Sequence, residues 1–355
     1  MSVTVIGAGK TGRGFIGRLL AEGGEHISFI DKDAALVAAL NEKNAYRVGF
    51  FGGKREDFTV ADYRAFTWEQ VERIKDELIL VSVCGPNLAD VGAALKARLD
   101  PNRHYYIITA ENSSKPAKVL KEAIGAANVS VSESTVFCTT IESDGLNISS
   151  ENYPYLQCDA DLLEGYVPAV KGIRPVGEFG NFLTRKLFTY NAASCVIAYL
   201  GWLRGYTDYG EAANDPEILS LLDRNYAATN RALCAEFGYE AKDQAEFAAL
   251  SKVKFTDRTI VDTVARNARE PQRKLGAAER VIGPMLLLHK YGEDTEVLEM
   301  TAAAMLCYDN EGEDKWRAIK AEKSAADILC EIGGVPDDHP CFARIMKHYE
   351  VFSRK

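Results

Sequence analysis

One stretch divides this chain into two kinds of sequence: Thr184-Arg185-Lys186-Leu187-Phe188-Thr189-Tyr190-Asn191-Ala192-Ala193-Ser194-Cys195-Val196-Ile197-Ala198-Tyr199-Leu200-Gly201. Its apolar side chains recur at helical spacing and Gly201 supplies a stop signal, which together predict a helix. A lysine and an asparagine in a largely apolar helix carry a desolvation cost. Lys186 and Asn191 are therefore either functional groups or, in the plainer interpretation, a core helix whose lysine reaches out to water.

Strands and helices alternate before this stretch, and helical spacing prevails after it. A chain of 355 residues exceeds the usual size of a single core. We therefore predict a dinucleotide-binding domain over 1–175 and a helical substrate and catalytic domain over 176–355. The fold class is α/β, a Rossmann-type doubly wound sheet domain followed by an all-helical C-terminal domain.

Composition excludes several classes of function. The formal net charge of -9 argues against nucleic acid or an anionic membrane as the main partner. No apolar run approaches the roughly 20 residues of a membrane span. The eight cysteines are scattered without zinc spacing, and the run from Asp337 to Cys341 matches no zinc pattern either. We expect reduced thiols, a cytoplasmic protein, no metal and a small-molecule substrate.

The amino terminus carries a glycine pattern that is typical of a pyrophosphate loop. The residues Gly7-Ala8-Gly9-Lys10-Thr11-Gly12 join an apolar strand at 2–6 to a helical run at 18–22. In such a loop Gly7 makes the tight turn, Gly9 admits the pyrophosphate and Gly12 lets helix and strand pack closely. The plainer alternative is a tight turn alone.

A second strand over 27–30 ends at Asp31, about 20 residues beyond the glycines, where a ribose-binding acid is expected. A carboxylate there accepts from the ribose hydroxyls and repels a 2′-phosphate, so NAD is favoured over NADP. The adjacent Lys32 weakens that preference slightly.

Two further strand ends point to the same crevice. The strand over 77–83 ends at Cys84 and Gly85, and the strand over 105–109 ends before Glu111 and Asn112. Ligands of doubly wound sheets lie beyond the carboxyl ends of the strands. We expect Cys84 and Asn112 beside the cofactor and Glu111 beside the substrate, although Asn112 and Ser113 could equally cap the next helix.

The remaining elements are predicted from periodicity. Extra strands over 46–51 and 58–60 form an insertion at the sheet edge, a helix covers 69–75, and further strands cover 129–131, 136–140 and 153–158. Helices in the second half cover 216–237, 242–250, 276–291, 294–306, 315–332 and 342–352.

A basic cluster stands out in the second half of this acidic chain: Arg266, Arg269, Arg273, Lys274 and Arg280. A solvated helix face is one interpretation. The other is that Arg273, Lys274 or Arg280 grips a substrate phosphate or carboxylate.

The order of these motifs resembles the long-chain mannitol dehydrogenase family. The similar pieces are the glycine loop through Gly17, Glu111-Asn112, the helix from Arg185 to Gly201, and Arg273-Lys274-Leu275 with Glu279-Arg280 and Gly283-Pro284. In this family the central helix carries Lys-x-x-x-x-Asn-x-x-His. Lys186 and Asn191 match, and Ser194 occupies the histidine position.

The resemblance implies NAD-dependent hydride transfer between a sugar alcohol, or its phosphate such as mannitol 1-phosphate, and the matching ketose. Lys186 would be the general base, Asn191 would hold the oxygen, and Ser194 would support the lysine. On a straight helix Lys186 and Asn191 lie about 140° apart, so their convergence requires the long lysine stem or a local distortion. The alternatives are an NAD-binding sensor without turnover, suggested by Ser194, and an opine-type dehydrogenase.

Overall fold

A computed structural model of the protein describes residues 2–53, 55–113 and 115–354. The chain divides into two compact units, Met1–Gly180 and Asn181–Lys355. Each unit is described by itself below.

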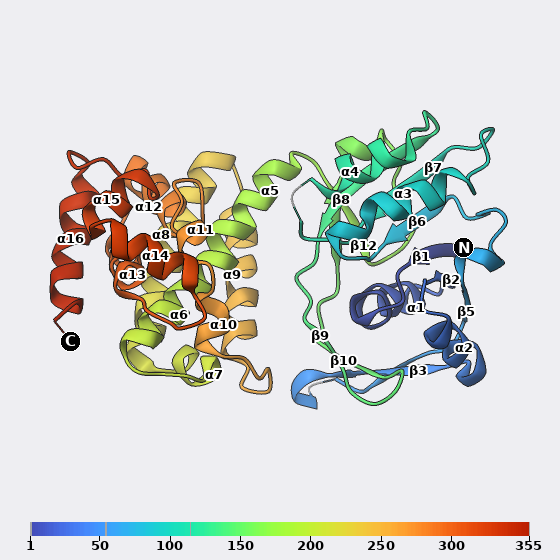
Figure 1. The fold of residues 1–355 in the computed structure, drawn as a ribbon, viewed down its shortest axis with the longest axis horizontal. Coiled ribbons are helices and arrows are strands. Elements are labelled where there is room, and N and C mark those ends of the chain that lie inside the picture. The colour runs from blue at the N-terminus through green and yellow to red at the C-terminus, as the bar shows by residue number, and fades with distance from the viewer. Residues whose placement is uncertain (1, 54, 114, 355) are drawn as a thin grey trace. The chain divides into compact units, whose positions relative to one another are not determined.

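The first unit is built around an eight-stranded sheet (Figure 1). Its strands run in the order β12 (Ile173–Val176), β11 (Leu156–Asp159), β8 (Val129–Thr135), β7 (Tyr105–Thr109), β6 (Leu78–Val81), β1 (Ser2–Ile6), β2 (His26–Ile30) and β5 (Tyr63–Phe66). The pairs from β8 to β5 are parallel, whereas β11 pairs with β8 in antiparallel fashion. Parallel neighbours require crossover helices, and these cover both faces.

Alternate residues of the central strands enter two different cores. Val3 and Val5 of β1 pack with the helices α1 (Arg18–Glu22) and α2 (Ala34–Lys43). Ile6 of β1 instead belongs to the core beneath α3 (Leu88–Lys96) and α4 (Pro116–Ile124). The first half is therefore doubly wound, as predicted, because side chains of a strand alternate between the faces.

The predicted insertion at the sheet edge is wrong in its placement. The strands β3 (Tyr46–Phe50) and β4 (Phe58–Val60) belong to a separate four-stranded sheet with β10 (Ile148–Ser150) and β9 (Thr140–Glu142), in the order β4-β3-β10-β9. The two edge strands of the main sheet are β5 and β12, and periodicity predicted neither of them. Pairing between residues about 100 positions apart decides this membership, and local patterns do not record such pairing.

Several predicted bounds also change. The expected helix over 69–75 is a single turn, η3 (Trp68–Gln70), and residues 136–139 lie outside any strand. The predicted strand over 153–158 is β11, which begins at Leu156. The expected helix over 276–291 begins only at Ile282, and the one over 315–332 is broken at Ser324, whose hydroxyl caps a new helix.

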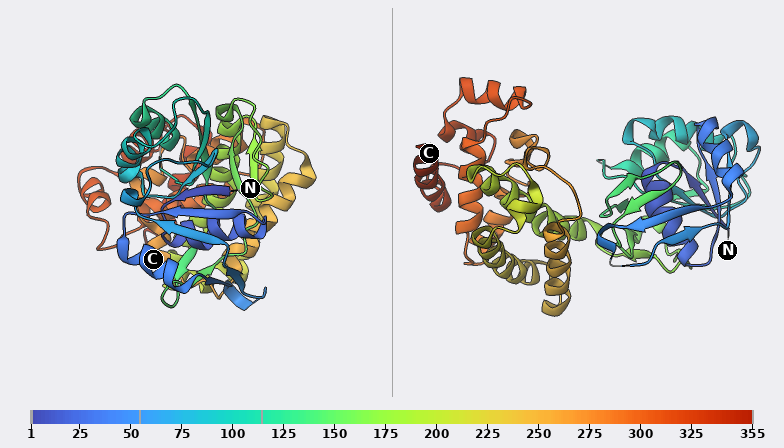
Figure 2. Two further views of the ribbon diagram at one scale, coloured as in Figure 1. Left: turned by 90° about the vertical axis from the view of Figure 1, so that its right-hand side faces the viewer. Right: turned by 90° about the horizontal axis from the view of Figure 1, so that it is seen from below.

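The second unit consists of helices, apart from one isolated bridge between Asp208 and Thr263 in the described residues (Figure 2). The helical segments are α5 (Phe179–Lys186, which starts two residues before the unit boundary), η6 (Leu187–Asn191), α6 (Ala192–Leu203), α7 (Tyr209–Ala213), α8 (Pro216–Phe237), α9 (Ala241–Thr256), α10 (Val264–Ala268), α11 (Pro271–Lys274), α12 (Ile282–Lys290), α13 (Glu296–Cys307), α14 (Asp314–Glu322), α15 (Ala325–Glu331) and α16 (Pro340–Phe352). The buried helix α6 lies in the main core of this unit with residues of α8, α12, α13 and α16.

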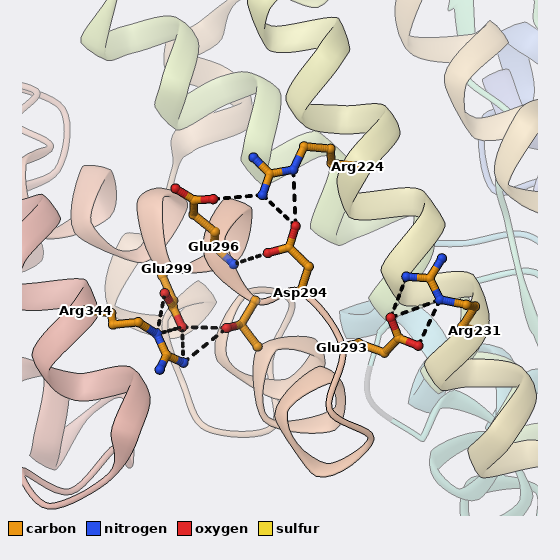
Figure 3. Close-up of polar contacts among 8 residues, drawn as sticks. Arg224, Arg231, Glu293, Asp294, Glu296, Glu299 and Arg344 are labelled. Carbon is orange, nitrogen blue, oxygen red and sulfur yellow. Dashed lines mark hydrogen bonds and ion pairs between the residues drawn. The ribbon is translucent and has the colours of Figure 1, made fainter.

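Ion pairs join the helices of this unit (Figure 3). Arg344 of α16 donates from Nε to both carboxylate oxygens of Glu299, at 2.9 and 3.0 Å, and only 1% of the Glu299 side chain is exposed. Arg224 of α8 contacts Asp294 and Glu296 at 2.6 and 2.8 Å, all three being partly exposed. The pair that contains the buried Glu299 carboxylate therefore matters most for stability, because a buried carboxylate without its partner is strongly destabilising.

Among the described residues, no helix combines the length and the hydropathy that crossing a membrane would require. All eight cysteines are free thiols.

Candidate functional site

The glycine loop has the geometry expected of a pyrophosphate cradle. Gly7 has a φ of 94°, in the left-handed region that favours glycine. A Cβ at Gly12 would lie 1.9 Å from the Gly7 carbonyl oxygen, whereas a Cβ at Gly9 would meet nothing within 4 Å. The close packing at Gly12 and the open space at Gly9 are the two properties that a bound pyrophosphate requires.

Two opposite charges hold the peptide unit of Ala8. The Ala8 N–H donates to Asp31 Oδ2 at 2.6 Å, and the Ala8 carbonyl accepts from the Arg13 guanidinium. Arg13 is 1% exposed, and burial lowers its pKa. Arg13 was not predicted as a site residue from the sequence, because its role depends on the folded loop.

Asp31 stands where it was predicted, at the end of β2. Its second oxygen, Oδ1, accepts the Asp33 N–H at 2.9 Å. Each carboxylate oxygen has a further lone pair, so the group keeps the capacity to accept from ribose hydroxyls. The residues of this unit therefore fit NAD.

The ends of β6 and β7 do come together. A Cβ at Gly85 would lie 3.2 Å from the Ser113 side chain, and Cys84 beside it is exposed. Burial raises the pKa of Glu111, although the N–H groups of Ser113 and Asn112 donate to its carboxylate. This places Cys84 and Glu111 at neighbouring strand ends.

Asn112 does not cap the next helix, and its side chain bonds to the main chain after β8. Its amide donates to the Val136 carbonyl at 3.0 Å, and its side-chain oxygen accepts the Val136 N–H at 2.9 Å. The capping interpretation is wrong, because α4 starts at Pro116 after Lys115 in the left-handed conformation. Thr11 likewise turns to the small sheet, where its hydroxyl lies 3.4 Å from that of Thr140, and Lys10 is exposed.

The helix that carries Lys186 and Asn191 is widened between these two residues. Residues Leu187–Asn191 form a π-helix, and the Ala192 N–H reaches back to the Leu187 carbonyl. Hydrogen bonds from i to i+5 place residues five apart on adjoining turns. Lys186 and Asn191 therefore lie on one side of the helix. Of the two ways in which they could converge, the local distortion of the helix applies, and the length of the lysine side chain is not needed.

A buried network supports the widened segment. Arg185 donates from Nε to Gln244 Oε1 at 2.7 Å, and Gln244 Nε2 donates to the Thr189 hydroxyl at 3.2 Å. The Arg185 guanidinium also lies 4.3 Å from the ring centroid of Phe247. Arg185, which lies two residues before the π segment, and Thr189 at its middle are thus tied to Gln244 of α9.

Lys186 has the titration expected of a general base. Burial, followed by the neighbouring charges of Lys254 and Arg280, lowers its pKa to about 8. At neutral pH a useful share of the amine is therefore uncharged. The Asn191 side chain is half-buried and has no hydrogen-bond partner among the described residues, so its amide is available for an oxygen atom.

Ser194 is three residues beyond Asn191 and shares its face. Its hydroxyl donates to Asn267 Oδ1 at 3.3 Å and lies beside the Tyr209 hydroxyl. Neither Asn267 nor Lys254 was singled out from the sequence. Their residue types are ordinary for exposed helices, and only their proximity to Ser194 and Lys186 distinguishes them.

The structure separates the basic cluster into two groups. Arg280 and Lys274 lie near the helical segment that carries Lys186 and Cys195. Burial lowers the pKa of Lys274 to about 8, and its ammonium donates to the Asn267 carbonyl at 2.6 Å. Arg273 pairs with Glu270 at 2.8 Å but remains close enough to lower the pKa of Lys274. Arg266 and Arg269 are exposed, which fits the solvated-face interpretation for these two.

Metal-ligating side chains do not gather in the described parts of the chain, since no group of three His, Cys, Asp or Glu residues could hold an ion. His339 of the run considered above instead caps α16, accepting the Cys341 N–H at 3.2 Å.

Comparisons with known proteins match both halves of the chain. A family model described as the mannitol dehydrogenase C-terminal domain matches residues 178–333, and one described as ketopantoate reductase PanE/ApbA matches residues 3–150. Among curated proteins, the mannitol-1-phosphate 5-dehydrogenase of Brevibacillus brevis is 29% identical, with 94% of each chain covered. The protein of the same name from Geobacillus thermodenitrificans is 25% identical over the whole of both chains.

Two solved structures share the fold. The Pseudomonas fluorescens mannitol 2-dehydrogenase, in ternary complex with NAD and D-mannitol, has a TM-score of 0.66 at 13% identity and covers 99% of this chain and 91% of its own. A substrate-free D-sorbitol dehydrogenase has a TM-score of 0.74 at 11% identity, with 99% and 92% covered.

Proposed function

Because the chain belongs to the mannitol dehydrogenase family, we propose that it is an NAD-dependent dehydrogenase that interconverts a sugar-alcohol phosphate, such as mannitol 1-phosphate, and the matching ketose phosphate. The observation that carries the chemistry is the π-helical segment that aligns Lys186, whose pKa is about 8, with Asn191. The family relation supports oxidation of a secondary alcohol as the reaction class.

The residues take separate roles in this reaction. When bound, NAD⁺ supplies the acceptor for the hydride that leaves the alcohol carbon. Neutral Lys186 removes the hydroxyl proton and becomes an ammonium, and in ketose reduction the ammonium returns that proton. The Asn191 amide donates to the substrate oxygen, where negative charge develops, and so stabilises it.

The cofactor is held by residues of the first unit. Gly9 leaves room for the pyrophosphate and Asp31 accepts from the ribose diol, while Gly7 and Gly12 keep the loop in shape. We propose Cys84 as a neighbour of the cofactor. Asn112 would act on it indirectly, by holding Val136 beside the strand ends.

The phosphate is assigned to the second unit, with two arguments in support. The full-length relatives are named for a phosphorylated substrate. In this acidic protein, Lys254 and Arg280 lie near Lys186, and Lys274 lies near Arg280, so an anionic substrate would relieve the repulsion among these cations. We propose Arg280 and Lys274 as phosphate ligands, with Arg273 close to Lys274, and Glu111 as a further substrate neighbour.

A substrate panel tests the proposal. We expect NADH consumption with fructose 6-phosphate to exceed that with fructose, and Arg280→Met to raise the KM for the phosphate far more than for the free sugar. Arg266→Met, an exposed arginine of the same cluster, is the matched control and should leave both constants unchanged. Equal KM changes for the two sugars in Arg280→Met would remove the phosphate role.

The sensor alternative depends on Ser194 alone and finds no support among the relatives. A lysine whose pKa is lowered beside an available amide is also an arrangement that binding alone does not need. The free thiols favour a reducing compartment, and a cytoplasmic location remains a prediction on that ground.

A further inference from the structure

The catalytic helix has a second polar contact that the reaction described above does not use. The hydroxyl of Ser194 donates to Asn267 Oδ1 at 3.3 Å. Asn267 belongs to α10, a short helix that packs along α6, and the Tyr199 hydroxyl of α6 donates to the Ala268 carbonyl at 2.8 Å. The contact between Ser194 and Asn267 therefore joins two elements that are already held together.

Asn267 also binds the ammonium of Lys274. Lys274 Nζ donates to the main-chain oxygen of Asn267 at 2.6 Å, and the Lys274 side chain is buried. Asn267 is itself fixed, because its N–H and its amide both donate to the Thr263 carbonyl, at 3.2 and 3.1 Å. One immobilised residue thus bridges a hydroxyl on the catalytic helix and an ammonium from α11.

The direction of the hydrogen bond determines what Ser194 can offer. A serine hydroxyl has one proton and two lone pairs. With its proton committed to Asn267 Oδ1, Ser194 presents two lone pairs and acts as an acceptor. The adjacent buried Tyr209 hydroxyl can donate to one of them, which leaves the other for a further donor. Because Ser194 shares a face with Asn191, an acceptor at this position suits a hydroxyl of the polyol next to the reacting carbon.

We propose that Asn267 is a positioning residue of the dehydrogenase site: its side-chain oxygen sets Ser194 as a hydrogen-bond acceptor for the substrate, while its main-chain oxygen holds the Lys274 ammonium. This inference rests on the proposed function. It gives Ser194, the position that departs from the family pattern, a hydrogen-bond partner about 70 residues away in the sequence.

A double-mutant cycle tests the coupling. Asn267→Ala removes the acceptor of Ser194 but keeps the main-chain oxygen, and Ser194→Ala removes the donor. Each should raise the KM for the polyol phosphate about 3- to 10-fold, the usual worth of one neutral hydrogen bond, with kcat and the KM for NAD nearly unchanged. Because the residues act as one unit, the double variant should match either single variant. Effects that multiply would overturn the proposal.

Rescue of the KM by a substitution that keeps the acceptor at Asn267 provides the second readout. Asn267→Asp keeps an acceptor for the Ser194 hydroxyl and should recover most of the KM, whereas Asn267→Leu should not. Arg266→Ala, one residue away and exposed, is the control and should leave KM unchanged. An Asn267→Asp variant no better than Asn267→Leu would also refute the inference.

Measuring Tm for the two single variants and the double variant separates failure of the inference from failure of the proposed function. If no polyol or polyol phosphate is turned over by the unmodified protein, the proposed function fails and the positioning role with it. Non-additive shifts in Tm for Ser194→Ala and Asn267→Ala would then identify the contact as purely structural. Normal turnover with additive KM effects would overturn the inference alone.

Discussion

The charge on Lys186 leads to the most demanding prediction. If the neutral amine is the base, the rate of alcohol oxidation rises with pH through the pKa of Lys186, and ketose reduction falls through it. Burial and the charges of Lys254 and Arg280 place that pKa at about 8. Removing the Lys254 charge by Lys254→Met should therefore raise the pKa and move both pH profiles upward.

The magnitude follows from the fraction of neutral amine at pH 7. A lysine with a pKa of about 8 is neutral in about one molecule in ten, and one at its ordinary value of 10.5 in about one in three thousand. Burial is the largest cause and remains in Lys254→Met, so the midpoint should rise by about one pH unit or less. A full unit would lower the oxidation rate at pH 7 about tenfold and leave the plateau at high pH unchanged.

The assay is NADH formation at saturating substrate from pH 6 to 11. Lys252→Met is the matched control, because Lys252 lies on the same helix and its ammonium pairs with Asp223 at 2.6 Å. This variant should keep the original midpoint. Lys186→Ala should lower turnover by about two to four orders of magnitude at every pH.

Two results would refute this reasoning. One is a midpoint in Lys254→Met that stays in place or moves down, because loss of a neighbouring positive charge can only favour the protonated lysine. The other is a Lys186→Ala protein that keeps the original turnover. In that case Lys274, whose pKa is also about 8, becomes the next group to test.

Three further predictions concern the two units separately. Asp31→Ala should narrow the preference for NAD over NADP, measured as the ratio of kcat/KM values; equal use of both by the unmodified protein would contradict the assignment of Asp31. Gly12→Ala places a Cβ 1.9 Å from the Gly7 carbonyl oxygen and should lower Tm, whereas Gly9→Ala should keep Tm and weaken NAD binding about tenfold or more. Calorimetry of both variants measures Tm and NAD affinity. A lower Tm in Gly9→Ala with weaker NAD binding only in Gly12→Ala would refute the loop geometry. Arg344→Ala leaves the buried Glu299 carboxylate without its cation and should reduce the free energy of unfolding in urea by about 3–5 kcal/mol, against about 0–1 kcal/mol for the exposed Arg224→Ala; equal losses would show that burial does not set the difference (Figure 3).

The sequence by itself determined the features that depend on near neighbours along the chain. The strand at 2–6, the glycine loop and Asp31 are found where the pattern indicated, because a tight turn followed by a helix is specified by residues within a few positions. The helix 216–237 has its predicted bounds, since Asp215 caps its start and Gly238 ends it. Lys186 and Asn191 were singled out as polar residues in a largely apolar helix and from the family resemblance, and their catalytic roles stay predictions.

Only the tertiary structure decided how distant segments combine. The strands at 46–50 and 148–150 pair into a second sheet, although neither carries a local sign of the other. The π-helical turn that aligns Lys186 with Asn191 is held by Gln244, more than fifty residues further along the chain.

Helix packing in the second unit determines both the pKa of Lys186 and the hydrogen-bond partner of Ser194. The lysine is buried and faces Lys254 and Arg280, and the serine meets Asn267, all brought together by helix packing in the second unit. Desolvation and Coulomb interactions depend on distance in space rather than on separation in sequence. The residue types could therefore be read from the chain, but their chemistry was decided by the fold.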